Sequence, residues 1–248
     1  MGESVPTLIA IAIAFLLGGL VKGVLGLGLP TAAIGILGLT MTPAKAAALL
    51  VIPTFVTNVW QFAAGPRLGP VLQRIWSLLL GICLGTLAGI GQLTGEAAGR
   101  ATMALGIVLM LYALIALAAP RLVVPRRAEP WLSPLIGLVT GLVTAATGLM
   151  VIPAVPYLQA LALPRDELVQ ALGLSFTVST IALAATLIHE GVFQLSIAGA
   201  SLLALVPAVA GMMLGQVMRN RISPAVFRFC FLIGLLVLGA HLAMRTLL

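Results

Sequence analysis

Charge is scarce in this sequence: only 8% of its 248 residues are Asp, Glu, Lys or Arg. A soluble domain carries about 25% charged residues. The chain is also 61% hydrophobic, with a mean hydropathy of +1.22. One water-soluble core of this size cannot hide so much apolar surface, so we expect the bilayer to be the solvent. The composition predicts one membrane domain and leaves no room for a second, soluble one.

Cysteine and histidine are scarce as well. Cys83 and Cys230 lie in apolar segments with no second Cys or His nearby, which argues against a disulfide framework or a zinc site. His189 and His241 lie far apart near segment ends, and no Gly-x-x-x-x-Gly-Lys-Ser/Thr loop is present. An intramembrane metalloenzyme and an ATP-driven pump are therefore not expected. We predict no enzyme activity and no cofactor.

The few acidic residues lie outside the apolar runs, so a buried carboxylate site for sodium or protons is not evident. The formal charge of +7 could suggest nucleic acid, but the basic residues lie mostly in short connections, where they set membrane topology. The region Met1–Val5 contains Glu3 and no Lys or Arg, so we do not expect a cleavable signal peptide.

Apolar runs of about 20 residues predict membrane-spanning helices. Eight such runs are Pro6–Leu25, Ala44–Ala64, Val71–Gly91, Ala101–Ala119, Trp131–Thr147, Leu168–Ile188, Ile197–Met218 and Pro224–Met244. Two shorter apolar pieces, Thr31–Leu39 and Leu149–Leu161, each follow an interruption. Both are too short to cross a bilayer comfortably alone.

The chain repeats itself. The stretch Gly19–Leu25 reads Gly-Leu-Val-Lys-Gly-Val-Leu and returns at Gly137–Val143 as Gly-Leu-Val-Thr-Gly-Leu-Val. Further matches pair Pro43 with Pro164, Gly81-x-x-x-Gly85 with Gly211-x-x-x-Gly215, Arg100 with Arg228, and Gly106 with Gly234. We predict an all-α polytopic membrane protein with two homologous repeats, residues 1–119 and 131–248, joined by a linker at 120–130. Each repeat is expected to contain a broken first segment and three transmembrane helices.

The basic residues bear on topology. If each broken segment crosses once, the basic residues other than Lys22 divide six to six between the two sides of the membrane. If each goes in and returns, nine share one side, and only Lys45, Arg100 and Arg245 oppose them. Membrane proteins normally show such an excess on the cytoplasmic side. We therefore favour returning segments, which make the repeats inverted and leave both termini outside.

The interruptions are candidate binding elements. Backbone that leaves helical pairing inside a bilayer must be buried in protein or line a wet cavity. A half-helix starting after each break would direct free N–H groups toward the membrane centre, where they attract anions. The residues concerned are Gly26, Gly28, Pro30, Thr31, Thr147 and Gly148. Close helix packing is the alternative interpretation of any single glycine.

Lys22 is the only Lys or Arg well inside an apolar run. A lysine in mid-membrane costs about 2.5–3.5 kcal/mol on insertion scales, so it usually faces a cavity or a partner. It could bind an anionic substrate, or it could lie near a segment end and extend its ammonium to the interface.

Polar residues mark the runs that follow the breaks. Thr54, Asn58 and Gln61 share one helix face, and Ser175 and Ser179 share another. They could contact substrate or form interhelical hydrogen bonds. The complete set of candidate substrate-binding residues is Lys22, Gly26, Gly28, Thr31, Thr54, Asn58, Gln61, Thr147, Gly148, Ser175 and Ser179.

The pattern resembles the TauE/SafE family of sulfite and organosulfonate transporters. The resemblance rests on Gly19–Pro30, Gly137–Pro153, the Pro43 and Pro164 starts, and residues 211–224. The family usually carries a glycine triplet at each break, where this chain has Gly28-Leu29-Pro30 and Ala146-Thr147-Gly148. These departures bear on the identity of the substrate.

The resemblance implies a secondary transporter in the cytoplasmic (inner) membrane of a bacterium. It would move sulfite or an organosulfonate such as sulfoacetate by alternating access. An anion channel or facilitator and a transporter of a small carboxylate are the alternatives. The expected partners are the small anion and the lipid bilayer, with a homodimer left open and no nucleic acid.

Overall fold

The computed structural model describes residues 5–94, 98–118, 123–219 and 221–245, and all regular structure in them is helical. The helices are α1 (Val5–Leu25), α2 (Leu29–Leu37), α3 (Pro43–Ala63), α4 (Leu68–Ala88), α5 (Ala98–Ala118), α6 (Glu129–Thr147), α7 (Ala154–Ala160), α8 (Arg165–His189), α9 (Leu195–Arg219) and α10 (Pro224–Arg245). In this part of the chain, all except α2 and α7 are long and apolar enough to cross a membrane. The predicted all-α polytopic membrane protein is confirmed.

Local sequence sets the helix ends at both breaks. Gly28 precedes α2 with a φ of 104°, and Gly148 ends α6 with a φ of 74°, a conformation that glycine adopts without strain. Pro30 lies in the first turn of α2, where no N–H is needed. The second short helix begins at Ala154 rather than at the expected Leu149. Pro153 accounts for the difference, because proline disfavours helical geometry in the residue before it.

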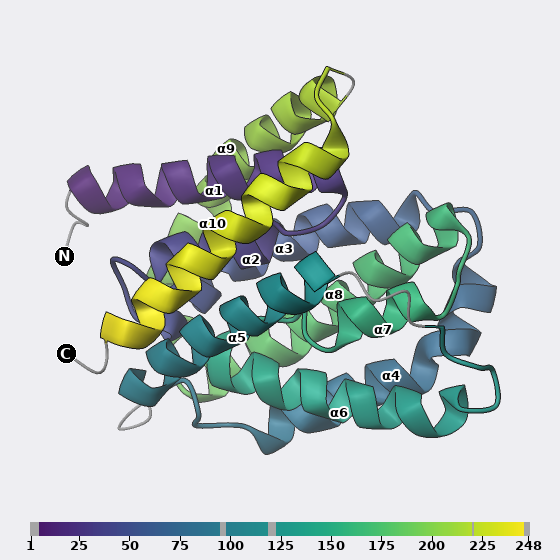
Figure 1. The fold of residues 1–248 in the computed structure, drawn as a ribbon. Helices are drawn as coiled ribbons and strands as arrows, with labels where there is room; N and C mark the ends of the chain where they lie inside the picture. The colour runs from purple at the N-terminus through teal and green to yellow at the C-terminus, as the bar shows by residue number, and fades with distance from the viewer. Residues whose placement is uncertain (1–4, 95–97, 119–122, 220, 246–248) are drawn as a thin grey trace.

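Each broken segment turns back on itself (Figure 1). A Cβ atom at Gly18 of α1 would lie 2.8 Å from the Leu29 carbonyl oxygen, so the start of α2 lies alongside the middle of α1. In the second half, Ser133 of α6 hydrogen-bonds Tyr157 of α7, which places α7 beside the start of α6. Both short helices therefore return toward the end of the bundle from which the preceding long helix came.

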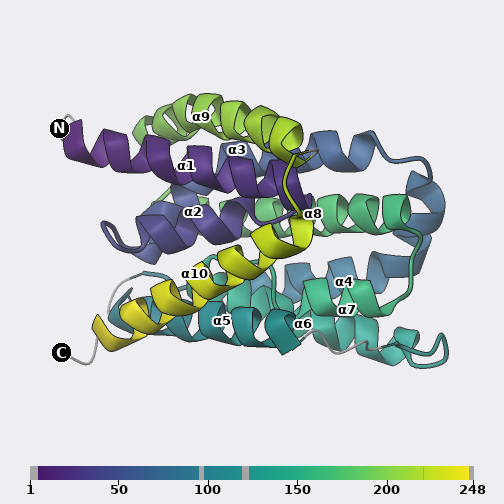
Figure 2. The same cartoon turned by 45° about the horizontal axis from the view of Figure 1, so that its top comes forward.

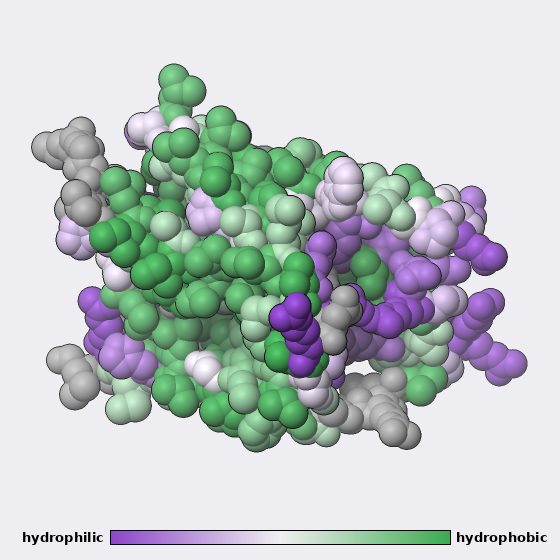
Figure 3. Space-filling view, turned by 90° about the horizontal axis from the view of Figure 1, so that it is seen from above, coloured by the Kyte–Doolittle hydropathy of each residue, from purple (hydrophilic) through white to green (hydrophobic). Residues whose placement is uncertain are grey.

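This course places most of the basic residues at one end of the bundle. Arg245 Nη1 donates to the Leu39 carbonyl oxygen at 2.7 Å, so the end of α10 lies beside the end of α2, at the same side as the start of α1 (Figure 1). Arg121 lies outside the described residues. The eight others that share the opposite end are Arg67, Arg74, Arg126, Arg127, Arg165, Arg219, Arg221 and Arg228. Hydrophilic residues accordingly gather toward one end of the face shown in Figure 3.

Glycine motifs join helices of different halves. Gly19 and Gly23 of α1 face α9 at Gly211 and Gly215, where a Cβ atom at Gly23 would lie 2.9 Å from the Gly215 Cα atom. The α4 motif, Gly81-x-x-x-Gly85, meets Gly137-x-x-x-Gly141 of α6 in the same way. Such motifs let helix backbones approach closely in lipid. Figures 1 and 2 show both pairs side by side.

α3 and α8 pack against each other in the middle of the bundle, and α3 also contacts α9 while α8 contacts α4. They are the most buried of the long helices in the described chain. Of the polar residues predicted on these two runs, Thr54, Asn58, Ser175 and Ser179 are buried, and Gln61 is half-buried.

Candidate functional site

Lys22 lies in the last turn of α1 and is 5% exposed. Its Nζ atom donates to Thr57 Oγ1 at 3.1 Å and to Asn58 Oδ1, both on α3. The side chain therefore turns into the protein toward α3 and does not extend to the interface. This contact joins the helix before the first break to the central helix α3.

The Lys22 ammonium group has no carboxylate partner among the described residues. Its two hydrogen-bond acceptors are neutral oxygens. A buried charge is costly unless it is both hydrogen-bonded and paired with an opposite charge. The environment of Lys22 is therefore one in which a small anion would gain strongly from electrostatic attraction.

Asn58 and Thr54 lie one helical turn apart on α3, both with 0% exposure. The Asn58 amide oxygen accepts from Lys22, while its Nδ2 atom has no hydrogen-bond partner among the described residues. Thr54 Oγ1 also has none. A buried polar group without a partner is destabilising, so these atoms are suited to bind a ligand that enters beside Lys22.

The first break supplies further donors. Gly26 has a φ of 79°, and apart from the glycine itself and its two chain neighbours, no described residue has a heavy atom within 4 Å of the position where its Cβ would be. The first turn of α2 has backbone N–H groups without helical acceptors. Thr31, in that turn, is 1% exposed, and no residue that the structure describes hydrogen-bonds its Oγ1 atom.

At the second break, the Thr147 hydroxyl is hydrogen-bonded to backbone groups of the same segment. Thr147 Oγ1 donates to the Val143 carbonyl oxygen at 2.7 Å and accepts from the Leu149 N–H at 3.2 Å. A Cβ atom at Gly148 would lie 2.6 Å from Ile34 Cδ1 of α2 and 3.0 Å from Ala47 Cβ of α3. This break thus packs directly against the first half of the chain, and the Thr147 hydroxyl is used locally.

The two serine candidates on α8 differ in whether their hydroxyl groups have a hydrogen-bond partner. Ser175 Oγ is buried and has no hydrogen-bond partner in the described part of the chain, whereas Ser179 Oγ donates to the Ser175 carbonyl oxygen at 2.9 Å. Gln61 Nε2 of α3 donates to the Val169 carbonyl oxygen of α8 at 3.0 Å. Gln61 therefore takes the interhelical role that was the alternative to substrate contact.

Of the predicted set, the structure brings Lys22 and Asn58 into direct contact. Thr57, the other acceptor for Lys22, was not predicted as part of the site. It shares a helix face with Thr54, Asn58 and Gln61, because the four positions follow the i, i+3, i+4, i+7 spacing. Only the position of α1 relative to α3 identifies it, because a partner for Lys22 cannot be derived from helix periodicity.

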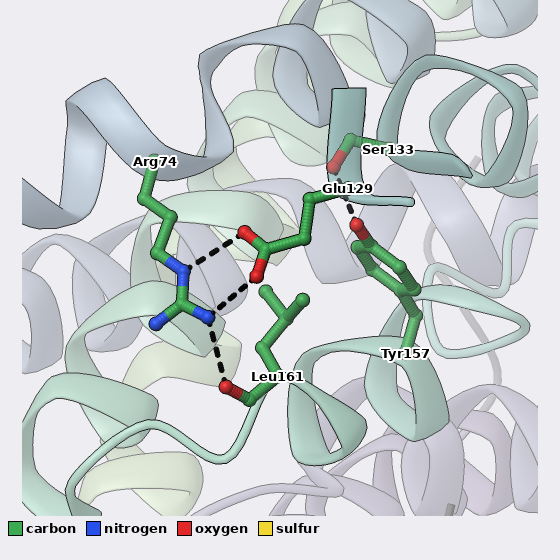
Figure 4. A network of polar contacts seen from close by, with 5 residues as sticks. All are labelled: Arg74, Glu129, Ser133, Tyr157 and Leu161. Atoms are coloured by element: carbon green, nitrogen blue, oxygen red, sulfur yellow. Dashed lines mark hydrogen bonds and ion pairs between the residues drawn. The ribbon is translucent and has the colours of Figure 1, made fainter. Parts of the chain in front are cut away.

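A second polar cluster lies where α4, α6 and α7 meet (Figure 4). The Arg74 guanidinium donates two hydrogen bonds to the Glu129 carboxylate, from Nε to Oε2 at 3.0 Å and from Nη2 to Oε1 at 2.7 Å. Arg74 Nη2 also donates to the Leu161 carbonyl oxygen at 2.9 Å, just after α7. Ser133 and Tyr157 hydrogen-bond beside this pair. Arg74 is one of the nine basic residues predicted to share one side of the membrane, and its contact with Glu129 was not predicted.

A family model described as "Sulfite exporter TauE/SafE" matches residues 10–242, a range that runs from α1 to α10 and includes both breaks. No curated protein and no solved structure matches the chain.

Proposed function

The chain belongs to the sulfite exporter TauE/SafE family, and from this membership we propose that it moves a small sulfur oxyanion, sulfite or an organosulfonate such as sulfoacetate. It is a multi-pass membrane transporter, and its family and its many spans agree on this. The finer proposal is that it works as a secondary transporter in the cytoplasmic membrane of a bacterium.

The observation that carries the proposal is the burial of Lys22 without a carboxylate partner in the described chain. Sulfite and sulfoacetate carry negative charge on oxygens that accept hydrogen bonds, and neither has an ammonium group that would need an acceptor. Their charge would neutralise Lys22, and the free Nδ2 of Asn58 could donate to a second oxygen. Thr31, Thr54 and Ser175 add hydroxyl donors that have no other described partner.

The arrangement of the helices supports alternating access between inverted repeats. The long helix before the first break packs on α9, and the long helix before the second break packs on α4. If α1 corresponds to α6 and α4 to α9 in the two repeats, the contact of α1 with α9 is equivalent to the contact of α6 with α4. The two broken segments also enter from opposite ends of the bundle, as inverted repeats require.

The distribution of arginines supports an orientation. The end of the bundle that carries Arg67, Arg126 and Arg165 would face the cytoplasm, because basic residues accumulate there. The start of α1 and the end of α10 would then face the outside.

The test uses purified protein in vesicles and measures saturable uptake of radiolabelled sulfite and sulfoacetate. Lys22→Ala and Asn58→Ala should each lower uptake by about tenfold or more, since each removes a charged or charge-assisted contact. Lys45→Ala, at the start of α3, and Gln159→Ala, at an exposed position of α7, are the matched controls. Melting temperatures would separate lost binding from lost folding.

Unchanged uptake in both site variants would remove the proposed site. A small carboxylate transported as well as sulfoacetate would move the assignment to a carboxylate transporter. A flux that neither saturates nor increases with substrate on the opposite side of the membrane would indicate an anion channel.

A further inference from the structure

A groove lies on the outer side of the crossing between α4 and α6, with a volume of about 890 Å³. It is lined by Gln73, Trp76 and Leu84 of α4, by Trp131 and Leu138 of α6, and by Arg126, which precedes α6. We refer to it as the α4–α6 groove. We propose that the groove binds one anionic phospholipid, with the headgroup phosphate at Arg126 and an acyl chain along the leucines.

The groove is polar at one end and apolar at the other. Gln73 and Arg126 lie at the arginine-rich end of the bundle, whereas Leu84 and Leu138 lie deeper along the same two helices. From Gln73 to Leu84 the groove follows α4 for about 16 Å at 1.5 Å per residue. That is roughly half of the ~30 Å hydrocarbon core, so the apolar part matches the depth of one lipid leaflet.

The charge of the polar end favours an anionic headgroup. Glu129 lines the groove, but its carboxylate is bound by Arg74 through two hydrogen bonds. Arg126 is exposed and forms no ion pair with any residue that the structure describes. The lining therefore has a net positive charge directed at solvent or lipid, and a phosphate accepts the hydrogen bonds of a guanidinium well.

Two tryptophans flank the same end. Trp76 is 56% exposed and Trp131 is 83% exposed, and both line the groove. Exposed tryptophan in a membrane protein lies at the level of the lipid headgroups, where its ring contacts the chains and its N–H meets polar groups. Basic pockets between transmembrane helices on the cytoplasmic side are typical sites for anionic headgroups.

The chain offers a direct reporter, because its only tryptophans are Trp60, Trp76 and Trp131. Trp60→Phe leaves fluorescence from the two groove residues alone. Trp76→Phe combined with Trp131→Phe leaves only Trp60, which is 72% exposed on α3 and serves as the matched control. Both proteins would be titrated in detergent with brominated phosphatidylglycerol and with brominated phosphatidylcholine of the same chain length, whose bromines quench nearby tryptophan.

We expect the groove tryptophans to be quenched at a severalfold lower concentration of phosphatidylglycerol than of phosphatidylcholine. Trp60 should show no headgroup preference. On the Trp60→Phe background, Arg126→Gln should reduce the preference by roughly fivefold, the contribution of one basic residue at an anionic surface. Arg127→Gln, which changes an exposed neighbour that does not line the groove, should leave it unchanged.

Three results would overturn the proposal: equal quenching by the two lipids, equal effects of Arg126→Gln and Arg127→Gln, or a protein dimer whose formation shields the groove tryptophans from both lipids. In a final experiment, soluble glycerol phosphate is added as a competitor. If it displaces brominated phosphatidylglycerol at similar concentrations, the groove recognises free phosphate and not a lipid. No arm depends on transport, so the outcome is independent of the proposed substrate.

Discussion

Ser201 of α9 donates a hydrogen bond to the carbonyl oxygen of Leu49 in α3 at 2.7 Å. Pro53 follows Leu49 by one helical turn and has no N–H, so this carbonyl lacks its helical donor. The Ile52 N–H also donates to Ser201 Oγ at 3.2 Å. An unsatisfied carbonyl inside a bilayer costs several kcal/mol. A side chain from the other half of the chain thus stabilises a proline in the helix that carries Asn58.

Ser201→Ala should lower the free energy of unfolding by about 1–2 kcal/mol, since it leaves the Leu49 carbonyl without a donor. Reversible unfolding in mixed detergent would measure the loss. Ser196→Ala, at an exposed position of α9, should change stability by less than about 0.5 kcal/mol. In a Pro53→Ala background, the residue at 53 regains an N–H for Leu49, so Ser201→Ala should cost less there. An equal cost in both backgrounds would contradict this account.

Gly148→Ala should destabilise the protein by about 1–3 kcal/mol, because an L side chain at a φ of 74° is strained and the new methyl would meet Ile34 and Ala47. Thermal unfolding would show the change as a lower melting temperature. Gly199→Ala is the control: Gly199 lies in α9 with nothing within 4 Å of its Cβ position, and alanine there should be neutral or stabilising. If both variants melt alike, the second break does not depend on its packing against α2 and α3.

The elements of this fold could be predicted from sequence where one local property decides them. Apolar runs located all eight long helices, because length and hydropathy suffice for a membrane span. Gly28 and Gly148 marked the breaks because only glycine adopts a positive φ freely. The return course of each broken segment followed from the basic residues, whose positions in short connections record which side each loop occupies.

Contacts between helices could not be predicted, because the rotation and depth of one helix against another are set by packing across the bundle. Gly106 matches Gly234 in the repeat, yet a Cβ atom at Gly106 would meet Gly239, while Gly234 has open space. Similarly, nothing local to Lys22 indicates that Thr57 and Asn58 accept its hydrogen bonds. A search for charged residues inside the apolar runs finds Lys22, but only the packing of the helices shows which residues it contacts.

Glu129→Gln should lower the free energy of unfolding by about 1–3 kcal/mol, since it leaves the Arg74 guanidinium without its charged partner in a partly buried position. The two side chains are 24% and 12% exposed. The pair Arg67 and Glu167 provides the comparison: Arg67 is 68% exposed, and Glu167→Gln should cost at most about 0.5 kcal/mol. Unfolding by urea in a neutral detergent at low ionic strength measures both losses with little screening of the ion pairs. Equal losses would show that the contact of Arg74 with Leu161, and not its charge pairing, holds this cluster.

Asn58→Asp tests whether the charge of Lys22 is available to a ligand. The two side chains have nearly the same shape, and Asn58 already accepts a hydrogen bond from Lys22 Nζ. Aspartate would therefore place a permanent counter-charge where we propose that an anion binds. The ligand-free protein should be as stable as the wild type or more stable, because a buried cation gains a partner.

The response to added anion should change in the opposite direction. Saturating ligand at 100 times its Kd stabilises a folded protein by about 2.7 kcal/mol, and wild-type protein should show such a rise in melting temperature with sulfite or sulfoacetate. Asn58→Asp should abolish the rise, because the carboxylate repels the anion and occupies Lys22. Gln159→Glu adds the same charge at an exposed position of α7 and should preserve the response. If Asn58→Asp is stabilised by the anions as strongly as the wild type, they bind elsewhere, and Lys22 serves the fold alone.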